Sequence, residues 1–215
     1  MPAPFVPRGV VHVTPPAGWG LIRYQEKVGG TSFCTVWSYV KVDTAGDAAG
    51  TSYTFTTSPT TLIVGVIHAA SDGSPTSPIV GSASQGSTTD GTTATAPAVA
   101  TSVANTMSLA LYAANTVDGS VATCSPAAGS ERSDFGALSH QSLELVEDTS
   151  DPNASRSTTI SASASWAAVH VVLGPRYWET PNDPTLVSPS NGAYADLENV
   201  DPWDESRDAR TYAGP

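Results

Sequence analysis

Apolar and polar residues alternate with a period of two along most of the chain between Val10 and Leu173. The clearest alternation lies at residues 61–68, 105–112 and 165–173, which are rich in Val, Ile, Leu and Ala. This period is typical of β-strands, because successive side chains of a strand point to opposite faces of the sheet. No apolar series at positions i, i+3, i+4 and i+7 persists for three helical turns, so we expect no helix. The pattern therefore predicts an all-β, antiparallel fold.

Turn-forming residues divide this region into short predicted strands at intervals of roughly 8–12 residues. Gly29 and Gly30 predict a two-residue hairpin turn, because both turn positions favour a positive φ. Residues 86–91 and 148–153 predict loops. This spacing predicts a jelly-roll-like β sandwich. The predicted strands are residues 10–13, 19–28, 32–42, 51–56, 61–70, 78–82, 92–103, 105–114, 130–134, 141–147, 157–163 and 165–173.

Composition divides the chain into three parts. Residues 1–9 contain three prolines and predict an extended N-terminal arm, while residues 10–174 predict the sandwich domain. Residues 175–215 contain eight of the 20 acidic residues and six prolines. They lack an alternation that could close a core, so we expect an acidic, extended C-terminal arm. Its large aromatic residues are candidate anchors at subunit interfaces, because nothing local can bury them. These candidates are Trp178, Tyr194, Trp203 and Tyr212.

Charge along the chain is sparse and negative. Charged residues make up 13% of the chain, about half of the usual quarter, and the net charge at pH 7 is −11. The Lys and Arg residues are scattered, so the chain lacks the basic surface that a phosphate backbone requires. No apolar run reaches the length of about 18 residues that spans a membrane, and the first residues do not form a signal peptide. We therefore expect no nucleic-acid partner, no membrane insertion and synthesis in the cytoplasm without a signal peptide.

Histidine is the residue type here with the greatest capacity for chemistry, because it serves as a base or a metal ligand. His68 and His170 lie in the most apolar predicted strands, and a pair on adjacent strands could act in either role. Ser139 and His140 follow Asp134, but no Gly-x-Ser-x-Gly nucleophile elbow accompanies them. We expect packed or strand-edge histidines without a catalytic role, no metal and no cofactor, and therefore no enzyme. The histidines are His12, His68, His140 and His170.

Acidic residues and cysteines offer two further possibilities. The acids at 144, 147, 148 and 151 could bind Ca²⁺ or form the carboxylate pair of a glycosidase. They lack the alternating spacing of a calcium loop, so a solvated strand end is the preferred interpretation. Cys34 and Cys124 are too few for a zinc site. Two separate buried thiols are the preferred interpretation, and a disulfide between the two cysteines is the alternative.

Aromatic residues recur at strand positions. Trp37 and Tyr39 share one face by the period of two, as do Tyr53 and Phe55. Packing between strands is the preferred interpretation of this pattern. A platform for stacking a carbohydrate is the alternative, with Trp37 and Trp166 as its possible ligand-binding residues.

Three segments form an ordered set. They are the Pro-Pro-Ala-Gly-Trp turn at 15–19, the Thr-Ala-Pro segment at 95–97 leading into 104–109, and the closing strand with Trp166 at 164–173. In this order they resemble a β-sandwich module of minor tail and other virion proteins of phages that infect actinobacteria. The turn at 125–132 also matches a late turn of that module. The resemblance covers residues 13–174, and it implies a role in virion architecture or host contact without implying a reaction.

Together these observations predict a bacteriophage virion structural protein. We expect a homo-oligomer that contacts copies of itself and neighbouring virion proteins. Its place in the particle is the tail, as a minor tail or tip protein, or the capsid surface, as a decoration protein. The alternative is a carbohydrate- or receptor-binding module on a phage tail or bacterial surface, which would recognise a host surface glycan.

Overall fold

The computed structural model describes residues 11–27, 34–42, 51–58, 63–70, 73–116, 120–137, 141–148 and 152–175. Within these residues all regular structure is β-strand and every pairing is antiparallel, which confirms the predicted fold class. No helix in this part of the chain is long and apolar enough to cross a membrane. The strands are β1 (His12–Thr14), β2 (Gly20–Glu26), β3 (Thr35–Val40), β4 (Thr56–Ser58), β5 (Ile79–Gly86), β6 (Gly91–Ala96), β7 (Met107–Thr116), β8 (Cys124–Pro126), β9 (Ser130–Ala137), β10 (Gln141–Asp148) and β11 (Arg156–Leu173).

The largest sheet has the strand order β5-β11-β7-β10-β9. Strand β11 lies between β5 and β7, so His170 is opposite Ala83 on one side and Ala110 on the other. Strand β9 is at the far edge and is paired with β10. A register shift between Leu145 and Val146 marks a β-bulge in this last pair.

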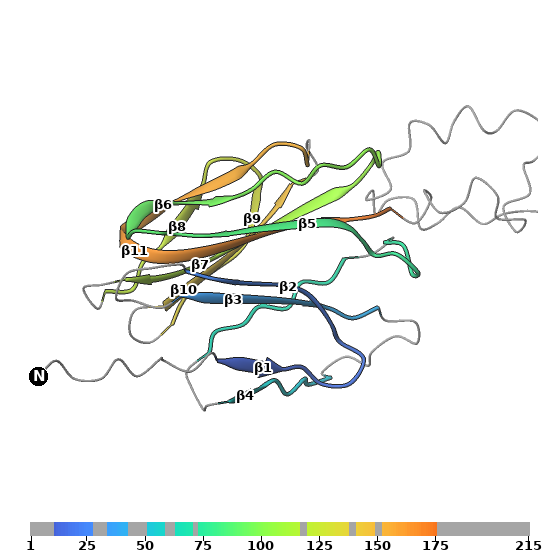
Figure 1. Ribbon diagram of the computed structural model, residues 1–215, viewed down its shortest axis with the longest axis horizontal. Helices are drawn as coiled ribbons and strands as arrows, with labels where there is room; N and C mark the ends of the chain where they lie inside the picture. The colour runs from blue at the N-terminus through green and yellow to red at the C-terminus, as the bar shows by residue number, and fades with distance from the viewer. Residues whose placement is uncertain are drawn as a thin grey trace, which may run out of the picture.

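Strand β11 belongs to two layers of the sandwich (Figure 1). Its first residues pair with β6 and β8, while its residues from Ala164 onward pair with β7. The register is interrupted between Thr159 and Ala164, where the strand turns from one layer to the other. The sequence predicted two strands here. The structure has one, because a bulge bends a strand without ending it.

The first core fills the space between these two layers. Tyr112 and Ile160 are 1% exposed and Trp166 is 8% exposed, and many of their neighbours in the cluster are alanines, including Ala96 and Ala168. Small side chains allow the two layers to approach closely around the few large ones. Close packing of this kind is what fixes one arrangement of layers.

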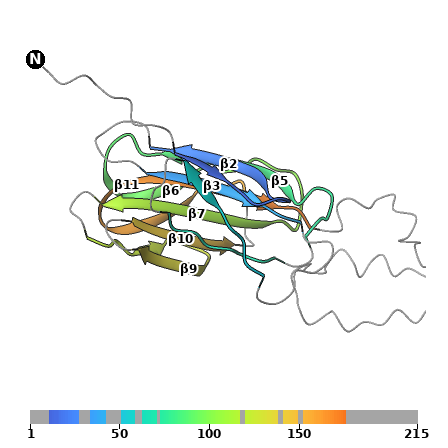
Figure 2. The same cartoon turned by 90° about the horizontal axis from the view of Figure 1, so that it is seen from below.

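The opposite face of the large sheet is covered by the hairpin-like pair β2–β3 (Figures 1 and 2). Cys34 and Val36 from this pair form a second core with Ala167, Val169 and Val171 of β11. Since residues 166, 168 and 170 face the first core and 167, 169 and 171 face the second, β11 is buried on both faces. The pair β1–β4 lies beyond β2–β3 as an outer layer (Figure 1).

The structure also differs from the predicted strands at residues 63–70 and at β8. Residues 63–70 are not paired in a sheet of the described structure, although their exposure alternates, with Ile63 46% and Ile67 60% exposed. Strand β8 was not predicted, because it is three residues long and ends at Pro126, a residue that signals a strand end. The two predicted arms and the Gly29-Gly30 turn lie outside the described residues, except that Pro175 pairs with Gly73.

Candidate functional site

Six aromatic side chains form a continuous series of ring contacts between β2–β3 and β1–β4, which we call the aromatic ladder. The centroid of Trp19 lies 5.1 Å from that of Tyr53 and 5.4 Å from that of Phe55, with both pairs edge to face. Phe55 continues the series to Tyr39 at 5.7 Å. The members of the ladder are Trp19, Tyr24, Trp37, Tyr39, Tyr53 and Phe55.

Strand β3 supplies the centre of the ladder. Trp37 and Tyr39 stack with their ring planes 7° apart and centroids 6.4 Å apart, which confirms that they share a face. The hydroxyl of Tyr39 donates a hydrogen bond to the carbonyl of Val13 on β1 at 2.8 Å. Lys41 Nζ lies 3.1 Å from the Tyr53 hydroxyl and 5.0 Å from that ring's centroid. The ladder therefore fastens the outer pair β1–β4 to β2–β3.

Trp37 was a possible ligand platform, and the structure places it in the middle of this packing. Its ring contacts Tyr24 at 4.3 Å as well as Tyr39, and it is half-buried. Its indole Nε1 is buried without a hydrogen-bond partner, as is that of Trp19. Tilted and edge-to-face rings are the usual geometry of a packed aromatic cluster. Packing is therefore the interpretation that the geometry supports.

Trp166, the second possible platform residue, is a member of the first core. Its backbone is tied to Ser87, whose amide donates to the Trp166 carbonyl at 2.9 Å and whose hydroxyl accepts from the Trp166 amide at 3.1 Å. A depression of about 330 Å³ lies beside the ring, lined by Trp166 and residues 85–93 of the β5–β6 hairpin. Most of this lining consists of Ser, Thr, Gln and Gly, so its chemistry is neutral and polar apart from Asp90.

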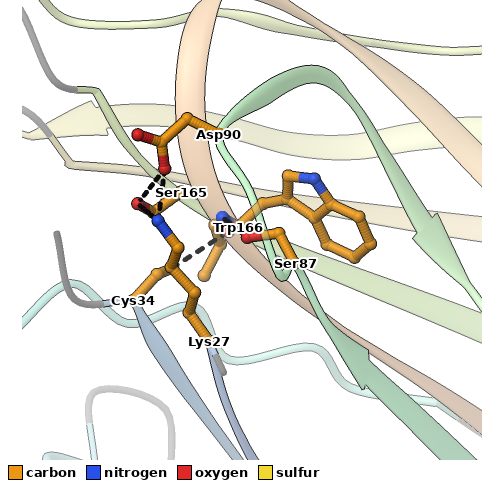
Figure 3. A network of polar contacts seen from close by, with 7 residues as sticks. Lys27, Cys34, Ser87, Asp90, Ser165 and Trp166 are labelled. Carbon is orange, nitrogen blue, oxygen red and sulfur yellow. Dashed lines mark hydrogen bonds and ion pairs between the residues drawn. The ribbon is translucent and has the colours of Figure 1, made fainter. Parts of the chain in front are cut away.

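A partly buried ion network lies next to this depression (Figure 3). Lys27, just after β2, forms an ion pair with Asp90 in the β5–β6 hairpin. The Ser165 hydroxyl on β11 lies 2.5 Å from Lys27 Nζ and donates to Asp90 Oδ1 at 2.7 Å. Hydrogen bonds from Lys27 and Ser165 lower the pKa of Asp90. The network thus connects three elements that are distant in sequence.

A serine beside a lysine is also a pair that some hydrolases use for nucleophilic attack. Such a lysine has to act as the base for the serine, whereas Lys27 is engaged in an ion pair with Asp90. Ser165 is also fully buried at 0% exposure, where no substrate reaches its hydroxyl. Sequence reasoning missed this network, because its members are not near one another in the chain. Its geometry supports a structural role.

The structure places His68 and His170 on opposite faces of the large sheet. His170 is 0% exposed, and its Nδ1 lies 2.8 Å from the Pro97 carbonyl, to which it donates as the Nδ1–H tautomer. His68 Nε2 lies 3.3 Å from Glu147 Oε2, and burial lowers the pKa of His68 more than Glu147 raises it. His12 is exposed on β1, and Ser139 and His140 lie outside the described residues. The described residues contain no cluster of His, Cys, Asp or Glu that could hold a metal ion.

The acidic residues of β10 also separate to opposite faces. Arg132 contacts Glu147 with two hydrogen bonds of 3.0 and 2.9 Å on the face of the sheet opposite the first core. Glu144 instead faces the first core, is 0% exposed, and has no hydrogen-bond partner for either carboxylate oxygen. The interpretation of these acids as a solvated strand end is therefore wrong for Glu144. The two carboxylates cannot act together as a glycosidase pair, because they face opposite sides of the sheet.

The two cysteines are free thiols in separate cores, as preferred from the sequence. The Cys34 Sγ donates to the Ala113 carbonyl at 3.2 Å, and burial raises the pKa of this thiol to about 12. Cys124 is packed against Ile160 in the first core. The proposed interface residues Trp178, Tyr194, Trp203 and Tyr212 lie outside the described residues.

A scan against models of protein families, a search of curated proteins and a search of solved structures each found no match for this chain.

Proposed function

We propose that this chain is a structural protein of a bacteriophage virion, and that it acts through contacts with copies of itself and with neighbouring virion proteins. The observation that carries the proposal is that polar groups of the sandwich join its layers to one another. The Lys27–Asp90–Ser165 network joins β2, the β5–β6 hairpin and β11. An ion pair that joins layers, with Lys27 buried and Asp90 partly exposed, favours one arrangement of these layers, which is what a repeated building block requires.

The remaining described cations also contact groups within the fold, although not all of them join layers. Arg23 Nη2 donates to the Ser82 carbonyl of β5, Lys41 contacts Tyr53, and Arg132 contacts Glu147. Arg156 Nη1 donates to the Ala154 carbonyl at 3.1 Å. The positive charges of the described sandwich are thus engaged within the fold, which supports a scaffold more than a site for acidic ligands.

Exposed apolar side chains of the described sandwich are available for contact with a neighbouring subunit. Leu21 is 54% exposed, Ile67 is 60% exposed and Phe135 is 55% exposed, and they come from different elements. The C-terminal arm adds aromatic residues and acids that would steer it to a basic surface of a neighbour. The resemblance to minor tail proteins favours the tail, and a capsid decoration protein has the same requirements.

Localisation in a particle tests this proposal. Particles purified from cells that produce the full chain would be labelled with an antibody raised against the sandwich and imaged by electron microscopy. We expect label at regular positions on the tail or the capsid, with a constant copy number. A chain that stays in the unsedimented fraction while complete particles form would overturn the proposal.

A carbohydrate- or receptor-binding module is the second candidate, favoured by the polar depression beside Trp166. Binding of the full chain to a glycan array would support this candidate if the binding is lost in Trp37→Phe or in Asp90→Asn. Loss in Trp37→Phe alone would indicate the aromatic ladder, and loss in Asp90→Asn alone would indicate the depression. No binding on the array would leave the structural role as the better explanation.

A further inference from the structure

Glu144 is an ionisable side chain enclosed in the first core. It lies in the middle of β10, directly opposite Tyr112 on β7 and Asp134 on β9. Directly paired residues of adjacent strands project from the same face of the sheet. Glu144 is 0% exposed and Tyr112 is 1% exposed, so this row of side chains runs from the interior at β7 to the sheet edge at β9.

The surroundings of Glu144 do not compensate a negative charge. Neither carboxylate oxygen of Glu144 has a partner in hydrogen-bond geometry, and the nearby Thr158 hydroxyl of β11 lowers the pKa of Glu144 by less than burial raises it. The charged groups that act on Glu144 are two further acids on β9, Glu131 and Asp134. Burying an isolated carboxylate is strongly unfavourable, and such a group usually takes up a proton instead.

The other titratable groups packed around this site also fail to neutralise it. Tyr112 from β7 keeps its proton, because burial and Glu144 raise its pKa, and Cys124 of β8 lies near that hydroxyl. Arg156 at the start of β11 acts on Tyr112 and donates to the Ala154 carbonyl at 3.1 Å. Among the described residues no Lys or Arg forms an ion pair with the Glu144 carboxyl.

We propose that Glu144 is a proton-controlled latch on the sheet edge: while its side chain is a neutral carboxylic acid β9 stays paired with β10, and loss of the proton loosens β9. The edge strand is the part that gives way, because β9 pairs with β10 alone in the described sheet and a bulge interrupts that pair. Ionised Glu144 would also face Asp134 directly across the two strands, and like charges in that position are destabilising. Loosening β9 would bare the hydrogen-bonding edge of β10, which could then accept a strand from another chain.

The direction of the pH dependence follows from the pKa. Burial, with Glu131 and Asp134, raises the pKa of Glu144 from 4.5 to about 7, against a smaller lowering by Thr158. A group whose pKa is higher in the folded state contributes stability that is complete below the unfolded pKa and is lost as pH rises through the folded pKa. The contribution of neutral Glu144 to the stability of the β9–β10 pair is therefore complete below about pH 4.5, falls progressively between 4.5 and 7, and is lost above about 7.

Hydrogen exchange of the full chain between pH 4 and 8, corrected for the intrinsic rate, tests the latch. We expect the protection of β9 amides to fall by about tenfold per pH unit within the window and to level off above it, since a tenfold change corresponds to one pKa unit. Amides of β7 and β11 should keep their protection. Glu144→Gln, which keeps the shape and cannot ionise, should remove the pH dependence of β9.

Two further variants make the result specific. Glu147→Gln changes an acid of the same strand on the opposite face, and it should keep the pH window of the unaltered chain. Asp134→Asn removes a charge that raises the pKa of Glu144, so the upper end of the window should move to lower pH. Unchanged pH dependence of β9 protection in Glu144→Gln would overturn the proposal, and so would a window that moves only in Glu147→Gln.

A measurement on the unaltered chain covers the case in which Glu144→Gln does not fold. Infrared spectroscopy at pH 6 distinguishes a protonated carboxylic acid from ionised carboxylates by its C=O stretch. We expect a buried acid band at pH 6 that disappears by pH 8. The absence of that band at pH 6 would show that Glu144 is already ionised and would refute the latch.

Discussion

Gly86, at the end of β5, lies directly against the backbone carbonyl of Glu26 at the end of β2, and no space for a Cβ atom remains between them. This close approach joins the large sheet to the pair β2–β3. It also brings Lys27, the residue after Glu26, to the β5–β6 hairpin that carries Asp90. The carbonyl belongs to the backbone, so a side chain at position 86 can be accommodated only if the two elements separate.

Gly86→Ala should therefore destabilise the fold by about 2–3 kcal/mol or more, the range that overpacking typically costs. Gly91→Ala is a matched control at the other end of the same hairpin, because a Cβ atom there meets nothing within 4 Å. We expect that control to change stability by less than about 1 kcal/mol. Urea denaturation of both variants gives the comparison, and equal stabilities would contradict the close approach.

Lys27→Met should cost about 2–3 kcal/mol, because it leaves Asp90 and Ser165 without their cation. The side chain of Asp90 is 26% exposed and retains some contact with water, so the cost should stay below that of a fully enclosed pair. Lys41→Met, at a half-buried lysine beside Tyr53, should cost less than about 1 kcal/mol. Adding Asp90→Asn to Lys27→Met should restore part of the loss in urea denaturation. A double variant less stable than Lys27→Met would show that the ion pair is not the reason.

Trp19→Ala should remove the centre of the contacts that hold β1–β4 in place, since Trp19 touches both Tyr53 and Phe55. We expect a loss of about 2 kcal/mol, lower than for a fully buried Trp because this ring is half-buried. Exchange protection should be lost first in β1 and β4. His12→Ala on the exposed face of β1 should change little, within about 0.5 kcal/mol. Equal losses of stability in the two variants would contradict the role of the aromatic ladder in holding β1–β4 against β2–β3.

Deletion of residues 176–215 should leave the sandwich folded with a similar melting temperature but unable to join its particle. The structure offers a natural end point at Pro175, which pairs with Gly73, while the Gly174 amide donates to the Pro78 carbonyl at 3.0 Å. Trp178→Ala and Trp203→Ala in the full chain should each weaken assembly by on the order of 2 kcal/mol. Calorimetry measures the first effect and particle occupancy the second. Full occupancy by the truncated chain would exclude the arm as a tether.

The sequence predicted the strands of the locally paired β2 and β3. Residues 19–28 and 32–42 contain β2 and β3, whose alternation places Trp37 and Tyr39 on one face. Residues 61–70 show the same alternation, yet residues 63–70 pair with no strand of the described structure. Alternation indicates that one face of a segment is more buried than the other. Which strand pairs with the segment depends on residues far away in the chain.

The candidate sites were harder to predict, because each depends on the tertiary arrangement. Glu144 looked like part of a solvated acidic strand end, and its position between β7 and β9 is what encloses it. The flanking Leu143, Leu145 and Val146 are apolar residues on both faces of the strand, and this pattern is the signal in the sequence that Glu144 is buried. Lys27, Asp90 and Ser165 come from three separate regions of the chain, so no spacing in the sequence indicates their contact.

The position of β11 also determines how the molecule would respond to a pull on its C-terminal end. The chain leaves the sheet at Leu173, and residues 167–173 are paired with β5 on one side and β7 on the other. A force applied there acts along the strand axis, parallel to its neighbours and perpendicular to the hydrogen bonds. The bonds of both ladders would share the load in shear instead of opening one after another. A subunit tethered through this end would therefore resist mechanical extraction through its most deeply embedded strand.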